Sequence, residues 1–217
     1  MKLSIIIPAL NEEGNIIELN KKLTTTLKEF NYELVYIDDG SKDKTLEKMK
    51  KIYNEDNEHI KYLSFSKNFG KDAAIYAGLK KCTGDLICII DSDLQQNPKY
   101  IISMYEHLKN NPDTDQIAMV MKDRNKENIL NRLFKKTFYY IMNKLSDITL
   151  IDGASDFRMF RKNIKIALLS LSENNRFTKG MFSWIGFNTE YMYYKVEKRF
   201  SGKTKFGLKN QIKYVII

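Results

Sequence analysis

The sequence predicts an α/β fold, with a Rossmann-like, mostly parallel central sheet flanked by helices, on the strength of three observations. Short apolar runs alternate with amphipathic helical patterns through about residue 121. Two of these runs end abruptly in carboxylates, LVYIDD from Leu34 and LICIIDSD from Leu86. Polar residues follow the runs directly, as expected where buried parallel strands lead into crossover helices.

The apolar runs give the expected strands in chain order. They lie at Leu3 to Ile7, Leu34 to Ile37, Ile60 to Phe65, Leu86 to Ile90 and Ile117 to Met121. The first run passes straight into polar residues, so it is interpreted as a strand and not as a signal peptide.

Helical patterns fill the intervals between these runs. Apolar residues recur every three or four positions from Ile16 to Phe30, and helices are expected at Thr45 to Tyr53, Lys71 to Lys81 and Pro98 to Leu108. Asn11 and Ser41 are expected to cap the helices that follow the first two strands.

Composition narrows the class of protein. The chain has 217 residues, 43% of them hydrophobic, and a net charge of +9, which favours an anionic partner such as nucleic acid, a phosphorylated small molecule or an acidic lipid surface. Cys82 and Cys88 are interpreted as reduced thiols of a cytosolic compartment. The sequence has neither a dinucleotide glycine fingerprint nor a Walker loop, which argues against oxidoreductases and P-loop proteins.

Asp91 and Asp93 are the most informative pair. In extended chain, side chains alternate between faces, so both carboxylates are expected on one face roughly 7 Å apart. Two hard oxygen donors so placed can hold one divalent cation, which commonly carries a phosphorylated substrate. The alternative is a solvated turn with two acids. Nucleic-acid binding would explain the net charge but not this acidic cluster, so no nucleic-acid partner is expected.

Two basic segments follow late in the chain. Asn128 to Leu145 has apolar residues at offsets of three and four, with Lys and Arg on the other side, which predicts a basic amphipathic helix. Such a helix packs on its own domain or lies in a membrane interface. Arg199 to Lys213 is also rich in basic residues. The apolar run from Tyr214 to Ile217 is either cut off in mid-pattern at a boundary of the sequence or a natural apolar terminus packed on the core.

Seven stretches, in order, connect the chain with a known family. They are SIIIPALNEE from Ser4, DDGSKDKT from Asp38, SKNFGKDAAIYAGL from Ser66, GDLICIIDSDLQQNP from Gly84, SDFRMF from Ser155, KGMFSWIGF from Lys179 and GKTKFGL from Gly202. On these stretches the chain resembles family 2 glycosyltransferases of the GT-A fold. It is most similar to their polyprenyl-phosphate branch, which includes dolichyl-phosphate mannose synthases and bactoprenol glucosyltransferases.

The resemblance implies that the first part of the chain binds a nucleotide-sugar donor. Asp39 would accept a hydrogen bond from the base, and Lys71 would flank the nucleoside pocket. A uridine diphosphate sugar is the favoured donor. The implied nucleotide-binding residues are Pro8, Ala9, Glu12, Asp39, Lys71 and Asp91.

The resemblance also implies a metal site. Asp91 and Asp93, helped by Gln95, would hold Mg²⁺ or Mn²⁺ against the donor diphosphate, where the cation offsets the charge of the leaving nucleoside diphosphate. Without the family context, Asp39 and Gln95 are better explained as caps or turn residues.

Asp156 is the implied catalytic residue, a base or an acceptor-orienting group in an inverting displacement. A phosphate monoester is already largely dianionic at neutral pH, so it needs positioning more than deprotonation, whereas a sugar hydroxyl needs a base. The alternative is that Asp156 caps or pairs with Arg158. The candidate phosphate-binding residues are Arg124, Arg199 and Lys205, each of which is also compatible with a solvated surface charge.

Some positions depart from the family pattern. Gln96 and Asn97 follow Gln95 where related chains often have His or Pro, and Lys195 stands where an Arg is common. Neither departure touches the implied core chemistry. The C-terminal membrane segment of many members is also missing.

The leading interpretation is a single GT-A catalytic domain over residues 1–217, with a nucleotide-sugar-binding half at 1–121 and an acceptor and membrane-facing half at 122–217. It would transfer a hexose to a polyprenyl phosphate at the cytoplasmic face of the membrane, in cell-envelope glycan synthesis, with an anionic lipid surface as partner. One alternative is transfer to a hydroxyl of a polysaccharide or glycoconjugate, and another is a nucleotide-sugar-binding module without turnover. A homo-oligomer is left open.

Overall fold

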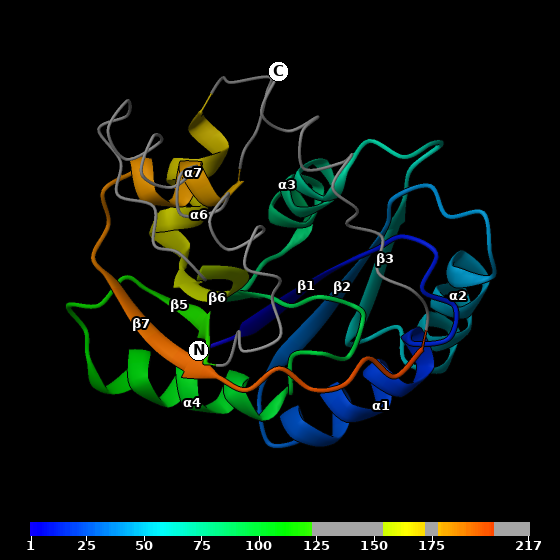
Figure 1. Cartoon of the computed structure of the whole chain (residues 1–217), viewed down its shortest axis with the longest axis horizontal. Coiled ribbons are helices and arrows are strands. Elements are labelled where there is room, and N and C mark those ends of the chain that lie inside the picture. The colour runs from blue at the N-terminus through cyan, green and yellow to red at the C-terminus, as the bar shows by residue number, and fades with distance from the viewer. Residues whose placement is uncertain (123–153, 172–177, 202–217) are drawn as a thin grey trace, which may run out of the picture.

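The computed structural model describes residues 1–122, 154–171 and 178–201 (Figure 1). Within them, seven strands form one sheet in the order β3-β2-β1-β4-β6-β5-β7. The strands are β1 (Leu3–Ala9), β2 (Tyr32–Asp38), β3 (Ile60–Ser64), β4 (Leu86–Ile89), β5 (Gln116–Met121), β6 (Ala154–Arg161) and β7 (Thr189–Tyr194). β1 to β4 pair in parallel, as do β5 and β7, whereas β6 runs antiparallel to both of its neighbours.

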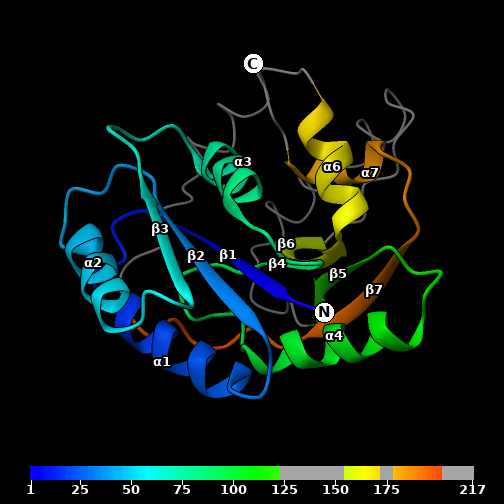
Figure 2. The ribbon, with the colours of Figure 1, turned by 180° about the vertical axis from the view of Figure 1, so that it is seen from behind.

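Helices cover both faces of the sheet (Figures 1 and 2). One face carries α1 (Ile16–Leu27), α2 (Thr45–Glu55) and α4 (Lys99–Asn110), whose buried residues belong to the larger hydrophobic cluster. The other face carries α3 (Lys71–Lys81), α6 (Lys162–Ser170) and α7 (Thr178–Trp184). The predicted mostly parallel sheet with flanking helices is confirmed.

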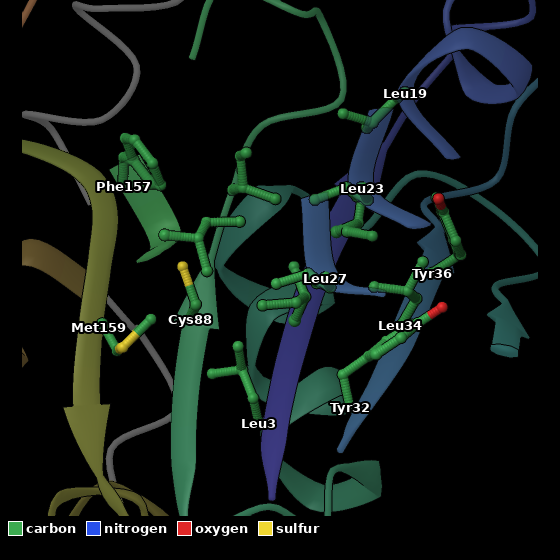
Figure 3. Close-up of a cluster of buried hydrophobic side chains, with 14 of the residues drawn as sticks. Leu3, Leu19, Leu23, Leu27, Tyr32, Leu34, Tyr36, Cys88, Phe157 and Met159 are labelled. Carbon is green, nitrogen blue, oxygen red and sulfur yellow. The ribbon is translucent and has the colours of Figure 1, made fainter. Parts of the chain in front are cut away.

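The core explains why the apolar runs become strands. Every residue of β1 is buried, with Leu3 on the α1 face and Ile6 on the α3 face, because successive side chains point to opposite faces. On α1, Leu19, Leu23 and Leu27 recur every four residues and pack over β1 and β2 (Figure 3). Burial of each such side chain stabilises the fold by about 1.5–3 kcal/mol.

The sequence did not predict the strands and helices of the second half. β6 alternates two buried apolar series, with Phe157 and Met159 in one cluster and Phe160 in the other. In SDFRMF, polar Asp156 and Arg158 alternate with apolar Phe157 and Met159, but this period of two covers only four residues, the shortest length that indicates a strand. The Tyr-rich run of β7, TEYMYY, has high β-propensity and was also readable as a strand.

The expectation that Asn11 and Ser41 cap helices is wrong. The N-cap residue of α1 is Asn15 and that of α2 is Lys44. Asn11 instead has a left-handed backbone with φ 48°, and its amide donates to Ser41 Oγ at 2.8 Å. Each loop continues for several residues before its helix begins, so Asn11 and Ser41 lie too early to be N-caps. Their hydrogen bond connects the two loops instead.

The basic helix expected at Asn128 to Leu145 lies outside the described residues, as does the segment beyond Ser201. Among the residues that are described, no helix combines the length and apolar content needed to cross a bilayer.

A buried carboxylate fixes the amino-terminal edge of the sheet. Glu33 on β2 accepts hydrogen bonds from Lys61 Nζ at 2.6 Å, Ser4 Oγ at 2.6 Å, Thr83 N at 2.5 Å and Lys2 Nζ at 3.1 Å. Burial alone would raise the pKa of Glu33, but these donors together outweigh it and lower the pKa from 4.5 to about 2. Glu33 therefore stabilises the fold in its ionised form.

We expect Glu33→Gln to reduce the free energy of unfolding by about 3 kcal/mol at pH 7. The folded-state pKa is depressed, so the contribution is fully present above about pH 4.5 and is lost as the pH falls toward 2. Urea titrations at pH 7, 4 and 2.5 should thus show the two proteins converging at low pH. Glu29→Gln is the matched control because Glu29 is exposed; an equal cost for both variants would contradict the assignment.

Candidate active site

The site is built at the carboxyl ends of β1, β2 and β4, where loops from neighbouring strands meet. The loop after β1 is joined to the loop after β2 by backbone-to-side-chain hydrogen bonds. Asn11 Oδ1 accepts from Lys42 N at 2.7 Å, and Glu12 N donates to Thr45 Oγ1 at 2.7 Å. Glu12 is buried and accepts a hydrogen bond of 2.5 Å from Asn15 Nδ2. The two loops therefore form one wall of the site.

Asp38 ends β2, Asp39 follows it, and the two carboxylates have different roles. Asp38 accepts hydrogen bonds from Ser41 N at 3.0 Å and Ser64 Oγ at 2.8 Å, which fixes the turn after its own strand. Asp39 is also buried, and it accepts hydrogen bonds from Phe69 N at 2.8 Å and Gly70 N at 3.0 Å. Burial raises the pKa of Asp39. This carboxylate holds the chain that leads into α3, and its oxygens keep lone pairs for further donors.

Gly40 allows the loop after β3 to approach this turn closely. Its φ is +70°, and a Cβ at this position would lie 2.3 Å from the carbonyl carbon of Lys67 and 2.7 Å from Asn68 N. Both atoms belong to the backbone, so relief of the clash requires the loop to move. Only glycine fits here.

We expect Gly40→Ala to destabilise the fold by about 2–4 kcal/mol, the sum of left-handed strain and overpacking. Gly186→Ala is the matched control, because Gly186 has φ +71° and nothing within 4 Å of its Cβ position. The control should cost only about 1 kcal/mol for backbone strain. Urea unfolding measures both values, and equal costs would remove the clash from the explanation.

Asp91 and Asp93 lie in a tight turn after β4. The strand ends at Ile89 and Leu94 has a left-handed backbone with φ 63°, so the expectation of extended chain through both aspartates is wrong. The turn still presents both carboxylates at the sheet edge. Burial raises the pKa of Asp93, and the neighbouring charge of Asp91 raises it further. The pair thus favours additional positive charge.

The two glutamines after the turn have distinct contacts. Gln96 is buried and makes two hydrogen bonds with Asp91. Its Nε2 donates to Asp91 Oδ2 at 2.9 Å, and its Oε1 accepts from Asp91 N at 2.9 Å. Gln95, the candidate metal ligand, donates its backbone amide to Asp93 Oδ1 at 3.1 Å. From the sequence, Gln96 was recognised only as a departure from the family pattern. Its contacts in the structure show that it orients Asp91.

Lys71, the first residue of α3, connects two parts of the site. Its Nζ lies 2.5 Å from Asp91 Oδ1 and 2.8 Å from Asp156 Oδ2. Burial alone would lower the pKa of Lys71, but Asp156 and Asp91 together raise it. The ammonium of Lys71 therefore contacts both carboxylates.

Arg158 is the alternative partner of Asp156. Its guanidinium lies 4.1 Å over the ring of Phe182 and donates to the carbonyl of Ser155 at 3.2 Å.

The segment after β7 crosses the site and delivers Arg199. In Figure 1 it runs from β7 past α4 toward the start of α1. Glu197 N donates to Gln95 O at 2.9 Å, and Arg199 Nη2 lies 2.7 Å from Asp93 Oδ2. Ser201 O then accepts from Asn15 Nδ2 at 3.3 Å, beside Gly14, where a Cβ would lie 2.4 Å from Ser201 Oγ. Each aspartate of the pair thus faces a basic side chain.

Most of the candidate residues lie along one edge of the sheet. Ala9 O accepts from Asp39 N at 2.9 Å, and Pro8 and Glu12 flank that position in the chain. The negative charge of Glu12 contributes to the raised pKa of Asp93, which links the two parts of the edge. Arg124 and Lys205 lie outside the described residues.

The donor set suits a hard divalent cation. Asp91 and Asp93 offer carboxylate oxygens that Lys71 and Arg199 now neutralise, so the position already favours positive charge. Within residues 1–122, 154–171 and 178–201, no three His, Cys, Asp or Glu side chains form a metal cluster. Mg²⁺ commonly takes one or two carboxylates together with substrate phosphates, and the aspartate pair matches that pattern.

Comparisons with known proteins identify the family of the chain. Residues 4–168 match the sequence model of glycosyl transferase family 2. The chain is 35% identical to the putative glycosyltransferase CsbB of Bacillus subtilis, covering 98% of this chain and 64% of that protein. It is also 35% identical to the prophage bactoprenol glucosyl transferase homolog of Escherichia coli, covering 95% and 67%.

A solved structure shares the fold. The glucosyl-3-phosphoglycerate synthase of Mycobacterium tuberculosis, crystallised with Mn²⁺, UDP-glucose and phosphoglyceric acid, superposes with a TM-score of 0.63 at 16% identity. The superposition covers 98% of this chain and 75% of that one. The GT-A fold expected from the sequence is thereby confirmed.

Proposed function

The chain belongs to glycosyl transferase family 2, and on that premise we propose that it transfers glucose from a uridine diphosphate sugar to a polyprenyl phosphate, with inversion at the anomeric carbon. The observation that carries the proposal is the gathering of Asp91, Asp93 and Asp156 around Lys71 and Arg199 at one sheet edge. Such an edge can bind a diphosphate through a cation and orient an anionic acceptor beside it. The bactoprenol glucosyl transferase homolog supports the choice of sugar and acceptor.

The donor would bind across β1, β2 and β4. Pro8, Ala9 and Glu12 would line the nucleoside pocket, with Asp39 accepting a hydrogen bond from the base. Uridine is favoured because the M. tuberculosis enzyme of the same fold holds UDP-glucose. Residues 1–121 would thus form the donor half of one GT-A domain, and residues 122–217 the acceptor half.

Asp91 and Asp93 would hold Mn²⁺ or Mg²⁺, with Gln95 beside them. Bound there, the cation would offset charge on the departing uridine diphosphate. Gln96 would keep Asp91 oriented through its two hydrogen bonds. Arg199 lies close enough to exchange Asp93 for a phosphate oxygen, since guanidinium binds both anions in similar geometry. Arg124 and Lys205 would supply further positive charge to the phosphates.

Asp156 would act on the acceptor. A polyprenyl phosphate is already largely dianionic at neutral pH, so Asp156 would orient it for attack on the anomeric carbon and would do little deprotonation. With a hydroxyl acceptor, the same carboxylate would take the proton as the general base. In both cases attack opposite the leaving diphosphate inverts the anomeric carbon.

The protein would work at the cytoplasmic face of the membrane. The chain spans 64–65% of the length of the first curated relatives. The net charge of +9 favours anionic lipid headgroups, each basic residue near the surface contributing about 1 kcal/mol. The basic segments at Asn128 to Leu145 and Arg199 to Lys213 are the proposed contacts with that surface.

A transfer assay tests the proposal. The chain is incubated in detergent with radiolabelled UDP-glucose, Mn²⁺ and undecaprenyl phosphate, and the lipid extract is analysed. We expect a glucosyl phosphate lipid whose anomeric configuration is inverted relative to the donor. The matched acceptor is undecaprenol, which has the same hydrocarbon but no phosphate and should stay unmodified. Transfer only to undecaprenol or to a soluble sugar would support the hydroxyl-acceptor alternative and overturn the proposal.

A further inference from the structure

Lys71 stands between two carboxylates that belong to different halves of the proposed reaction. Asp91 follows β4 and belongs to the donor side, whereas Asp156 lies on β6 and belongs to the acceptor side. β4 and β6 are antiparallel neighbours with Ile89 opposite Arg158. Asp91 follows the end of β4, Asp156 lies two residues before Arg158, and both contact Lys71 Nζ, at 2.5 Å and 2.8 Å. Like charges held this close repel, and the ammonium of Lys71 offsets the repulsion.

The backbone that carries Lys71 is held in place at the start of α3 and along its body. The preceding residue, Gly70, has φ +97°, and its amide is held by Asp39 at 3.0 Å. Farther along α3, Gly78 lets the helix approach β1, since a Cβ there would lie 2.5 Å from Ile6 Cγ2. The start of α3 is therefore anchored to the proposed nucleotide side, and its body is anchored to the sheet.

A divalent cation on Asp91 competes with Lys71 for the same carboxylate. Lys71 Nζ is 2.5 Å from Asp91 Oδ1, which is within direct contact range of the oxygen that a cation would use. Two positive charges at one carboxylate repel each other, so arrival of the cation weakens the Lys71–Asp91 contact. The contact with Asp156 Oδ2 at 2.8 Å does not suffer this competition.

We propose that Lys71 is a positioning residue that couples the donor site to the acceptor site. In the free enzyme its ammonium pairs with both Asp91 and Asp156 and offsets part of their combined negative charge. Once a divalent cation and the donor diphosphate occupy Asp91, Lys71 pairs with Asp156 alone and orients that carboxylate toward the acceptor. This inference rests on the proposed function and adds a role for a residue that the sequence assigned to the nucleoside pocket.

The proposal predicts effects of opposite sign in Lys71→Met. Removal of the ammonium removes the competitor for Asp91, so the donor-free enzyme should bind Mn²⁺ about 5-fold more tightly or better. Glucosyl transfer should nevertheless slow, with kcat about 10²-fold lower because Asp156 loses its orientation. A merely structural lysine would weaken both properties together. Lys71→Arg keeps the charge, and should keep the wild-type Mn²⁺ affinity and restore part of kcat.

The experiment measures Mn²⁺ alone, by electron paramagnetic resonance of the free ion, on the full chain and on each variant. Initial rates with UDP-glucose and undecaprenyl phosphate follow, with kcat and KM determined separately. Lys81→Met is the matched control, because Lys81 is an exposed lysine at the far end of the same helix and should match wild type. Circular dichroism shows that each variant is folded.

Tighter Mn²⁺ binding by Lys71→Met together with the loss of kcat supports the proposal. Unchanged or weaker Mn²⁺ binding by that variant, folded as judged by circular dichroism, overturns it, as does an undiminished kcat. If the wild-type chain transfers no glucose, the proposed function fails separately. The Mn²⁺ titrations of Lys71→Met and Lys71→Arg then still decide whether Lys71 competes for Asp91.

Discussion

We expect Asp156→Asn to lower the kcat of glucosyl transfer by about 10²-fold or more, while the affinity for UDP-glucose stays close to that of wild type. Asparagine keeps the shape of the side chain but removes the negative charge that faces Lys71 at 2.8 Å. The acceptor then loses the group that orients it, whereas the donor side keeps Asp39, Asp91 and Asp93. The loss should therefore appear in kcat and not in donor binding.

Two measurements check this result. Isothermal titration with UDP-glucose and Mn²⁺ reports the donor affinity, and single-turnover transfer to undecaprenyl phosphate reports the chemical step. Asp113→Asn removes an exposed carboxylate from the loop between α4 and β5 and serves as the control. Full transfer activity in a folded Asp156→Asn protein would exclude Asp156 from the mechanism. Loss of donor affinity would instead place Asp156 in the nucleotide site.

The second large effect is expected at the aspartate pair. Asp93→Asn should weaken Mn²⁺-dependent binding of uridine diphosphate by about 10²-fold. This is the upper end of the range, about 10- to 100-fold, seen when groups that support a metal ligand are removed. In the presence of a chelator the variant and wild type should bind the nucleotide alike, because the cation then contributes to neither.

The comparison between the two conditions makes this test specific to the metal. Calorimetry with uridine diphosphate is run with Mn²⁺ and with chelator for wild type, Asp93→Asn and the Asp113→Asn control. A loss of affinity of equal size in both conditions would indicate a damaged pocket. Undiminished affinity with Mn²⁺ would exclude Asp93 as a ligand. Preference for guanosine diphosphate would change only the base.

The sequence predicted those parts of the fold that depend on local pattern. Runs such as Leu34 to Ile37 are buried on both faces of the sheet, so their apolar character marks them without knowledge of their partners. β6 was missed because the alternation of Asp156 and Arg158 with Phe157 and Met159 covers only four residues. Their positions make sense only once strands from distant parts of the chain are paired.

The site shows the same division. Strand ends identified Asp39, Asp91 and Asp93, because carboxylates after a buried run are visible locally. The partners of these residues were not visible: Lys71 meets Asp156 across 85 residues of sequence, and Arg199 meets Asp93 across 106. Contacts of that separation depend on the topology of the sheet and leave no local periodicity.

The insertion of β6 has a consequence for the order in which the sheet can assemble. β4 and β5 are consecutive in sequence, yet β6 lies between them. β1 to β4 can pair as soon as each emerges from the ribosome. Among the described strands, the neighbours of β5 are β6 and β7, so β5 joins the sheet only once residues 154–161 have been synthesised. The strands that carry Asp39 and the Asp91–Asp93 turn can therefore assemble early. Asp156 arrives with the strand that joins β5 to β4, so the two sides of Lys71 are completed at different stages of folding.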